Sequence, residues 1–277
     1  MSALYRTHLE EYSEKFKEFF KMKRKNSILE VAFHTNGGAM KWDMETHRAI
    51  IPAFFDINCD PDNEVVILTG TGDAFLGEIS QEGMLRQGFT SFGTHQAYDI
   101  FYYDQTREPL ALLELKIPVI AAINGPSIVH AELVLLNDIV ICSENTYFQE
   151  AHWALQGIVP GDGVHTLFRE LLGPNRGRYF LYMGNKIYAE EALQLGLVSE
   201  VLPQDKLLDR AWEIAETIFM TKDRIQRRLT RSLLIQPWRE LFVKELNSGM
   251  AHESFGCYSY WPMAADKKFD YRKVGKE

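Results

Sequence analysis

The chain has 277 residues, a quarter of them charged, with a formal net charge of -8 and a pI near 5.6. This acidic balance argues against DNA or RNA as the main partner, because phosphate binding needs a basic face, and no apolar stretch is long enough to span a bilayer. The three cysteines stand singly, which suits a reducing compartment, so we expect a soluble cytoplasmic protein without a disulfide framework.

The first predicted elements are helical and then extended. Residues 1–25 carry aromatic and aliphatic side chains at helical spacing and predict an exposed amphipathic helix. A strand follows over residues 28–33. Trp42 then stands just before Asp43, which can cap a helix running to about Asn58.

Strands and helices alternate through the middle of the chain. Strands are expected at 65–70, 119–123 and 138–142, and helices at 97–115, 131–136, 165–172, 175–183, 189–195 and over most of the chain after Pro203. Glycines between polar residues predict a loop over 77–95. Strands separated by helices imply βαβ units and a mostly parallel sheet. We divide the chain into an N-terminal helical extension (1–25), a core (26–203) and a C-terminal helical trimerisation region with a tail (204–277).

Four motifs make the sequence specific. Two of them join a strand to a loop: VILTGTGDAF at 66–75 and IPVIAAINGP at 117–126. GIVPGDG follows at 157–163 and AEEALQLGLV at 189–198. In order and spacing these motifs resemble the crotonase (enoyl-CoA hydratase/isomerase) superfamily over roughly residues 28–255. The resemblance implies an α/β crotonase fold of repeated ββα units with a C-terminal helical region, assembled as homotrimers or homohexamers.

The family uses the two strand–loop motifs to build an oxyanion hole. Two backbone N–H groups point at a carbonyl oxygen that becomes an enolate, and each such donor contributes roughly 3–4 kcal/mol in the cases studied. The resemblance implies that the donors here are the N–H groups of Ile79 and His130.

The sequence departs from the CoA-dependent hydratases at their catalytic positions. Residues 128–130 replace a triple glycine with two β-branched side chains and an imidazole, which fill space that a CoA thioester would occupy. The two glutamates of the hydratases fall on Leu133 and, after a loop one residue longer than theirs, on His152 or Trp153. Hydratase chemistry is therefore disfavoured.

The branch containing 6-oxocamphor hydrolase and related β-diketone hydrolases, which use no CoA, is a better match. The resemblance implies a catalytic set of histidines and acids and a second set that binds substrate. The catalytic set is His130, His152, Asp162 and Glu253. The substrate-binding set is Trp42, Ile79 and Trp153.

The second histidine is defined by two competing counts. Strict spacing from Asp162 places it at Trp153, whereas a histidine stands one position earlier. We expect His152 to be the base, with Asp162 fixing its tautomer and raising its basicity. The alternative is a loop histidine beside a turn in which Asp162 makes only a local bond. His34 and His47 are expected to be surface or structural residues.

These features lead to three hypotheses about function. The first is a retro-Claisen hydrolase that cleaves a carbon–carbon bond of a small-molecule β-diketone, for which the resemblance implies no metal or redox cofactor. The second is an acyl-CoA hydratase, isomerase or thioesterase with Glu132 or Glu150 as acid and base. The third is a non-catalytic crotonase-fold protein. A basic run over 222–231 could grip a CoA phosphate, but a solvated charged face is the preferred interpretation.

Overall fold

The fold is built on one six-stranded sheet, in a computed structural model that describes residues 5–80 and 95–260. In sheet order the strands are β1 (Phe20–Lys25), β2 (Ile28–Phe33), β4 (Val65–Gly70), β6 (Val119–Ile123), β7 (Ile139–Ser143) and β10 (Glu200–Leu202). β1 pairs antiparallel with β2, and the other neighbours pair in parallel. The predicted mostly parallel α/β fold is therefore confirmed.

Two short sheets lie outside the main one. β3 (Lys41–Trp42) pairs in parallel with β5 (Glu78–Ile79), so that Trp42 lies opposite Ile79. β8 (Tyr147–Phe148) pairs antiparallel with β9 (Ile187–Tyr188). The first of these pairs places two of the predicted substrate-binding residues side by side.

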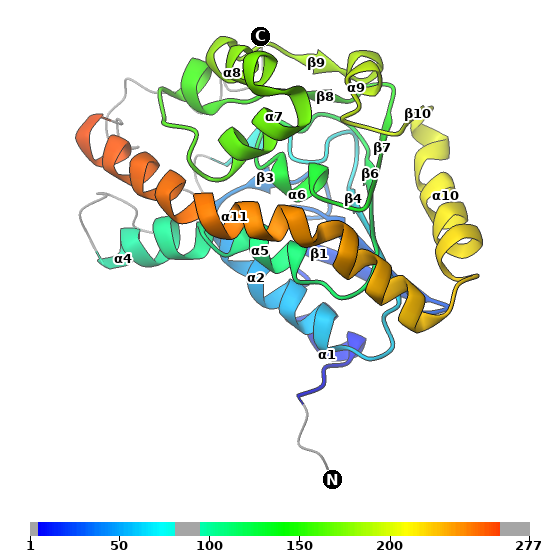
Figure 1. The fold of residues 1–277 in the computed structure, drawn as a ribbon. Helices are drawn as coiled ribbons and strands as arrows, with labels where there is room; N and C mark the ends of the chain where they lie inside the picture. The colour runs from blue at the N-terminus through cyan, green and yellow to red at the C-terminus, as the bar shows by residue number, and fades with distance from the viewer. Residues whose placement is uncertain (1–4, 81–94, 261–277) are drawn as a thin grey trace.

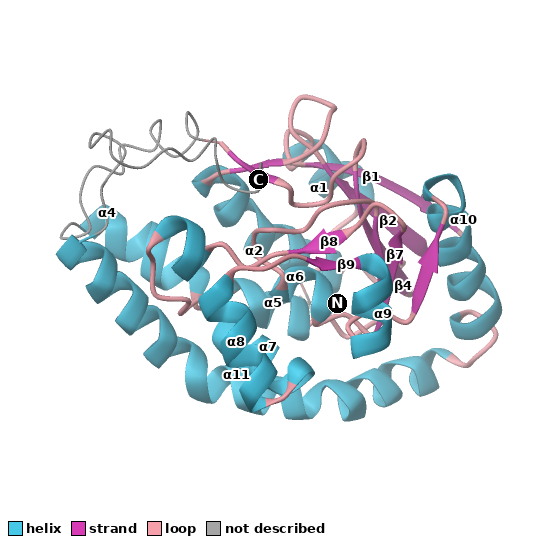
Figure 2. Ribbon diagram, turned by 90° about the horizontal axis from the view of Figure 1, so that it is seen from above, coloured by secondary structure: helices cyan, strands magenta, loops and turns pink. Residues whose placement is uncertain are grey.

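Helices cover both faces of the main sheet (Figures 1 and 2). On one face α10 (Gln204–Ile214) packs Leu207 and Ala211 against the side chains of Ile67 and Ile120. The larger part of the core lies on the other face. The remaining helices are α1 (Leu9–Lys15), α2 (Met44–Cys59), α4 (His95–Ala97), η1 (Tyr98–Tyr103), α5 (Glu108–Leu113), α6 (Glu132–Leu135), η2 (His152–Gln156), α7 (Val164–Leu172), α8 (Pro174–Met183), α9 (Ala189–Leu195), η3 (Ala215–Phe219) and α11 (Arg224–Tyr260).

The N-terminal segment differs from the helix predicted over residues 1–25. Within residues 5–25, α1 is the only helix, and Phe20–Lys25 form β1, along which exposed and more buried side chains alternate. Asn26 and Ser27 take positive φ angles of 51° and 64°, which closes a two-residue hairpin into β2. The prediction was wrong because a short run of aromatic residues does not distinguish a helix from a strand.

The basic run over 222–231 is only partly a solvated face, because Lys222 and Arg224 are exposed whereas two of its arginines are buried. Arg227 and Arg231 are 7% and 2% exposed. Arg227 Nη2 pairs with Glu64 Oε2 at 2.5 Å, and Arg231 Nη1 pairs with Asp138 Oδ2 at 2.5 Å. These ion pairs attach α11 to the ends of β4 and β7. The charge pattern alone could not show that Glu64 and Asp138, which directly precede β4 and β7, pair with these arginines.

No helix among the described residues is long and apolar enough to cross a membrane. Most of the loop expected over 77–95, and the tail from residue 261 onward, lie outside the described residues.

Candidate active site

The first part of the candidate site is formed by β3 and the start of α2. Asp43 caps α2 as predicted, with its Oδ1 accepting a hydrogen bond from Thr46 N at 2.8 Å. The cap fixes the first helical turn, so that the ring of His47 lies 5.6 Å from the ring of Trp42. His47 is fully buried, and its Nε2 lies 3.0 Å from Glu108 Oε2 on α5. Of the two roles expected for His47, surface or structural, its burial excludes the surface role.

Burial sets the charges of this inner pair. It lowers the pKa of His47 well below its ordinary value and raises the pKa of Glu108 to about 8. At neutral pH His47 is therefore an uncharged imidazole and Glu108 an uncharged acid. The pair adds no net charge beneath the site.

His130 lies in the loop between β6 and α6, where the hydratases have glycine. Its φ of 49° is in the left-handed region, which a side chain rarely adopts although histidine tolerates it better than most. The ring lies 4.3 Å from the Trp42 ring, and its Nδ1 shares a hydrogen bond of 2.6 Å with Glu132 Oε1. His130 is 6% exposed. Its imidazole is therefore held in a fixed orientation between Trp42 and Glu132.

His152 begins a π-helical turn, η2, whose wide turn takes in one more residue than an α-helical turn. The π-helical turn accommodates the extra residue expected in this loop, and the side chains of His152 and Trp153 point in different directions. His152 is turned toward Asp162, with Nε2 3.5 Å from Asp162 Oδ2. Trp153 is 49% exposed and packs edge-on against Tyr182. Of the two residues that compete for the histidine position, only His152 faces the acids.

Three carboxylates surround the imidazole of His152. Glu150 holds it from behind: one oxygen hydrogen-bonds Nδ1 and the other accepts from the His152 backbone N–H at 3.1 Å. Asp162 and Glu253 lie on the Nε2 side, at 3.5 and 3.9 Å. Asp162 Oδ2 also lies 3.8 Å from His130 Nδ1. Asp162 therefore stands between the two histidines.

The carboxylates determine the protonation of His152. Burial alone would lower its pKa, but the charges of Glu150 and Asp162 outweigh burial and raise the pKa well above its ordinary value. Burial would raise the pKa of Asp162, yet the two neighbouring histidines bring it below its ordinary value. Burial raises the pKa of Glu253 to about 8. These shifts favour the protonated form of His152, the ionised form of Asp162 and the protonated form of Glu253.

These groups open onto a cavity of about 50 Å³. Its lining joins an apolar wall to a polar end and includes Trp42, Ile79, His130, His152 and Glu253. Trp153 lies outside it and lines a separate cavity with Pro160 and His165. The structure thus brings six of the seven predicted site residues together, with Asp162 behind the lining, and leaves Trp153 apart.

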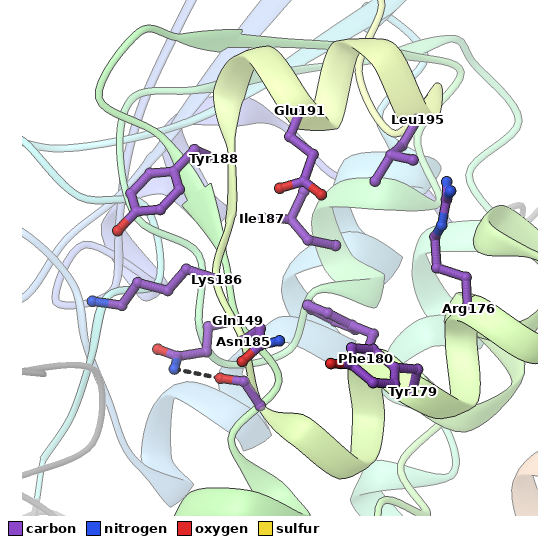
Figure 3. A pocket seen from close by; sticks show the side chains of 11 residues that line it. Gln149, Arg176, Tyr179, Phe180, Asn185, Lys186, Ile187, Tyr188, Glu191 and Leu195 are labelled. Atoms are coloured by element: carbon purple, nitrogen blue, oxygen red, sulfur yellow. Dashed lines mark hydrogen bonds between the residues drawn. The ribbon is translucent and has the colours of Figure 1, made fainter.

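A larger, open cavity of about 610 Å³ lies between α8, β9 and α9 (Figure 3). Gln149 Nε2 donates to Gly184 O at 2.8 Å at its edge. Among the described residues that line it, Glu191 is the only carboxylate and there is no histidine. Its size exceeds that of the first cavity, but it lacks an acid–base pair, so we place the chemistry at the histidine cluster.

Sequence reasoning gave little weight to the residues behind the site. The sequence offers Glu132 as an acid–base group for CoA chemistry and Glu150 for that or another chemical role, gives no reason to single out Glu108, and favours a surface or structural role for His47. The spacing offered one signal: Asp43 and His47 are four residues apart and so share a face at the helix start. The carboxylates gave no comparable signal, because nothing in their surroundings predicts burial.

The fold and the site define an α/β protein of the crotonase type. A family model described as enoyl-CoA hydratase/isomerase matches residues 23–246. The chain belongs to this family, whose superfamily is enzymatic. A carnitinyl-CoA dehydratase of Salmonella enteritidis is 32% identical over 208 residues, which cover 73% of this chain and 74% of that protein.

Solved structures give a second set of comparisons. A β-diketone hydrolase from the cyanobacterium Anabaena sp. PCC 7120, bound to (S)-3-oxocyclohexyl acetic acid, is 41% identical, with a TM-score of 0.84 over 90% of this chain and 97% of that one. An enoyl-CoA hydratase/isomerase from Mycobacterium paratuberculosis is 19% identical, with a TM-score of 0.77 over 94% and 98% of the two chains. The latter likeness concerns the fold alone.

Proposed function

We propose that this chain is a CoA-independent hydrolase that cleaves a carbon–carbon bond of a cyclic β-diketone by a retro-Claisen mechanism. The observation that carries the proposal is the buried group His152–Asp162–Glu253, facing His130 across a partly apolar cavity. Such a site has a base, an acid and hydrogen-bonding groups. Ile, Val and His stand at residues 128–130, where the hydratases have three glycines.

The cyanobacterial structure supports the substrate class. Its ligand, 3-oxocyclohexyl acetic acid, is a keto acid. Its carboxyl carbon can be joined, with loss of water, to the carbon beside the ketone that lies opposite the side chain across the ring. The result is a bicyclic 1,3-diketone. A keto acid of this kind is therefore the product expected from hydrolysis of a bicyclic diketone, and we transfer that substrate class to this chain.

The proposed reaction begins with the neutral form of His152, which is the minor form wherever the neighbouring carboxylates keep the ring protonated. Its Nε2 takes a proton from water, and the hydroxide oxygen adds to one ketone carbon. The bond from that carbon to the carbon between the two carbonyls then breaks, and its electron pair forms the enolate of the second ketone. The backbone N–H groups of Ile79 and His130, with the Trp42 indole, would stabilise the enolate oxygen.

Glu253 can complete the reaction. Its Oε2 accepts a hydrogen bond of 2.8 Å from Gly161 N, while Oε1 faces His152 and the cavity. As a protonated acid at neutral pH it can give a proton to the enolate carbon and recover one from His152. The sum is diketone plus water giving keto acid.

A direct assay separates this proposal from CoA chemistry, which the 32% identity to a carnitinyl-CoA dehydratase favours. The purified chain is given the bicyclic diketone corresponding to 3-oxocyclohexyl acetic acid and, separately, crotonyl-CoA and crotonobetainyl-CoA. We expect keto acid from the diketone and no turnover of either thioester. Turnover of a thioester alone would rule out the diketone hydrolase.

The pH dependence of the reaction should report His152. A base must be neutral, and an unperturbed histidine titrates near pH 6.5. Because Glu150, Asp162 and Glu253 face the ring and its pKa is raised, we expect kcat/KM to rise with pH through a range above that value. Glu150→Gln removes one negative charge, so the rising limb should move to lower pH. Rate measurements across pH test this shift.

Glu144→Gln is the matched control for that experiment. Glu144 lies on the same stretch of chain but is exposed, so its substitution should leave the pH profile unchanged. A profile for Glu150→Gln that coincides with the wild type would show that His152 is not the titrating base.

We also propose that the chain assembles into homotrimers or homohexamers. Large apolar side chains remain exposed at helical spacing along α11. Those more than 60% exposed include Ile225, Leu229, Leu233, Leu234 and Val243. Covering them against further copies would remove this apolar surface from water. Light scattering of the purified chain gives the number of copies, and a monomer at micromolar concentration would contradict the proposal.

A further inference from the structure

Asp162 Oδ2 is a buried carboxylate oxygen with unused bonding capacity. Asp162 is 2% exposed, and this oxygen has no hydrogen-bond partner among the described residues. It lies 3.5 Å from His152 Nε2, and Glu253 Oε1 lies 3.9 Å from the same nitrogen. All three atoms lie within 4.8 Å of one another. Three strong donor atoms therefore converge on one point.

The spacing suits a small divalent cation. Zinc binds imidazole nitrogen and carboxylate oxygen at roughly 2.0–2.2 Å, so neighbouring ligands of a tetrahedral ion lie about 3.4 Å apart. The 3.5 Å separation of His152 Nε2 and Asp162 Oδ2 matches this value, whereas Glu253 Oε1, at 3.9 Å from His152 Nε2, must move closer. Imidazole together with carboxylate favours zinc or cobalt over calcium or magnesium, which prefer oxygen alone.

The outward-facing atoms of the same residues are already held. His152 Nδ1 is hydrogen-bonded to Glu150, Glu253 Oε2 accepts from Gly161 N, and Asp162 Oδ1 accepts from Val164 N at 3.3 Å. A carboxylate behind the second nitrogen of a ligating histidine is the usual way in which proteins orient such ligands. The inward-facing atoms are thus oriented, and His152 and Glu253 leave a fourth position open to the cavity.

The other groupings of acids and histidines are less suitable. His130, Glu132 and Asp162 form a second grouping. In it, His130 Nδ1 is already hydrogen-bonded to Glu132 Oε1 at 2.6 Å, so that these two atoms are not available to an ion. The grouping of His47, Glu108 and His130 is entirely buried. Among these groupings of described residues, the one formed by His152, Asp162 and Glu253 is the one with two members, His152 and Glu253, that line the cavity.

We propose that His152 Nε2, Asp162 Oδ2 and Glu253 Oε1 form a reversible binding site for zinc-class divalent ions, and that a bound ion inhibits the enzyme. The ion uses the lone pair with which His152 would accept a proton from water. A ligating imidazole must be neutral and a ligating carboxyl group ionised, so the ion competes with protons and its affinity rises with pH. The inhibition rests on the proposed diketone hydrolase activity, but the binding does not.

Spectroscopy with cobalt tests binding without reference to activity. The full chain, freed of metal with a chelator, is titrated with Co²⁺, and the visible absorption of four-coordinate cobalt is followed. Zn²⁺ is then titrated calorimetrically in buffers of different protonation enthalpy. We expect one ion per chain, displacement of Co²⁺ by Zn²⁺, and release of protons. Cobalt that keeps the spectrum of the hexahydrated ion would overturn the site.

Variants locate the ion. Glu253→Gln and His152→Ala should lose the four-coordinate spectrum, and Glu150→Gln should weaken binding roughly 10–100-fold by releasing the ring. His252→Ala is the control, because this exposed histidine next to Glu253 is where an ion would bind adventitiously. Thermal unfolding checks that each variant is folded. Binding that survives in folded Glu253→Gln and His152→Ala but is lost in His252→Ala would overturn the proposal.

Activity measurements keep the two proposals apart. With diketone hydrolysis established, we expect Zn²⁺ to abolish turnover and a chelator to restore it. Unchanged or faster turnover with zinc bound would overturn the inhibition. If the spectrum shows the site but the metal-free chain hydrolyses no diketone, the proposed function fails while metal binding stands.

Discussion

Replacing His152 by alanine should lower diketone turnover by about 10²–10⁴-fold, the usual contribution of a general base. The structure gives the reason: Nε2 of His152 is the nitrogen that faces the cavity end of the site, while Nδ1 is held by Glu150. Steady-state rates with the bicyclic diketone measure the loss. His252→Ala, one residue from Glu253 and exposed, should retain the wild-type rate.

Asp162→Asn should cause a loss of similar size. Asparagine keeps the shape of aspartate but removes the negative charge that lies between His130 and His152. Because the two residues act as one unit, the double variant His152→Ala with Asp162→Asn should be scarcely slower than either single variant. If every detectable activity persisted in both single variants, the non-catalytic hypothesis would gain support.

Gly249→Ala should reduce both stability and activity. On an exposed helix this change normally stabilises by about 1 kcal/mol. Here an added Cβ would lie 2.3 Å from Gly161 O and 2.5 Å from His165 Cε1, because α11 meets the loop before Asp162 backbone to backbone. We expect the free energy of unfolding to fall by roughly 1–3 kcal/mol. Urea denaturation provides the measurement.

The loss of activity follows from the same contact. Gly161 N donates to Glu253 Oε2, so pushing α11 away moves Glu253 relative to Asp162. A displacement of about 1 Å can cost roughly 10²-fold in rate. Ser248→Ala is the matched control, since it changes the neighbouring, exposed residue without adding an atom. A Gly249→Ala variant as stable and active as this control would contradict the expected clash.

Much of the fold could be predicted from the sequence because its signals are local and strong. The buried strands β4 and β6 are continuous apolar runs, and Asp43 is a clear helix cap. The helix predicted over 97–115 was less accurate, since it is divided into η1 and α5, with Pro109 at the start of the latter. Strand β1 was missed because the alternation of exposed and more buried side chains along it arises only when it pairs with β2.

The candidate site was predictable only as far as the motifs reach. His130 and Asp162 lie next to motifs of fixed spacing, and their imidazole and carboxylate groups now lie 3.8 Å apart. The choice between His152 and Trp153 depended on the π-helical turn, which has no local sequence signature. The position of Glu150 behind His152 depended on the same turn, so its role as an orienting residue could not be inferred beforehand.

The close contact between Gly161 and Gly249 also bears on the order in which the parts of the candidate site come together. α11 follows every other described element of the chain, yet it supplies Glu253. During synthesis the strands and the segments that carry Trp42, His130 and Asp162 leave the ribosome first and can begin to fold. A nascent chain can therefore have a sheet without a complete catalytic centre. The candidate site is complete only when α11 has docked and brought Glu253 to His152.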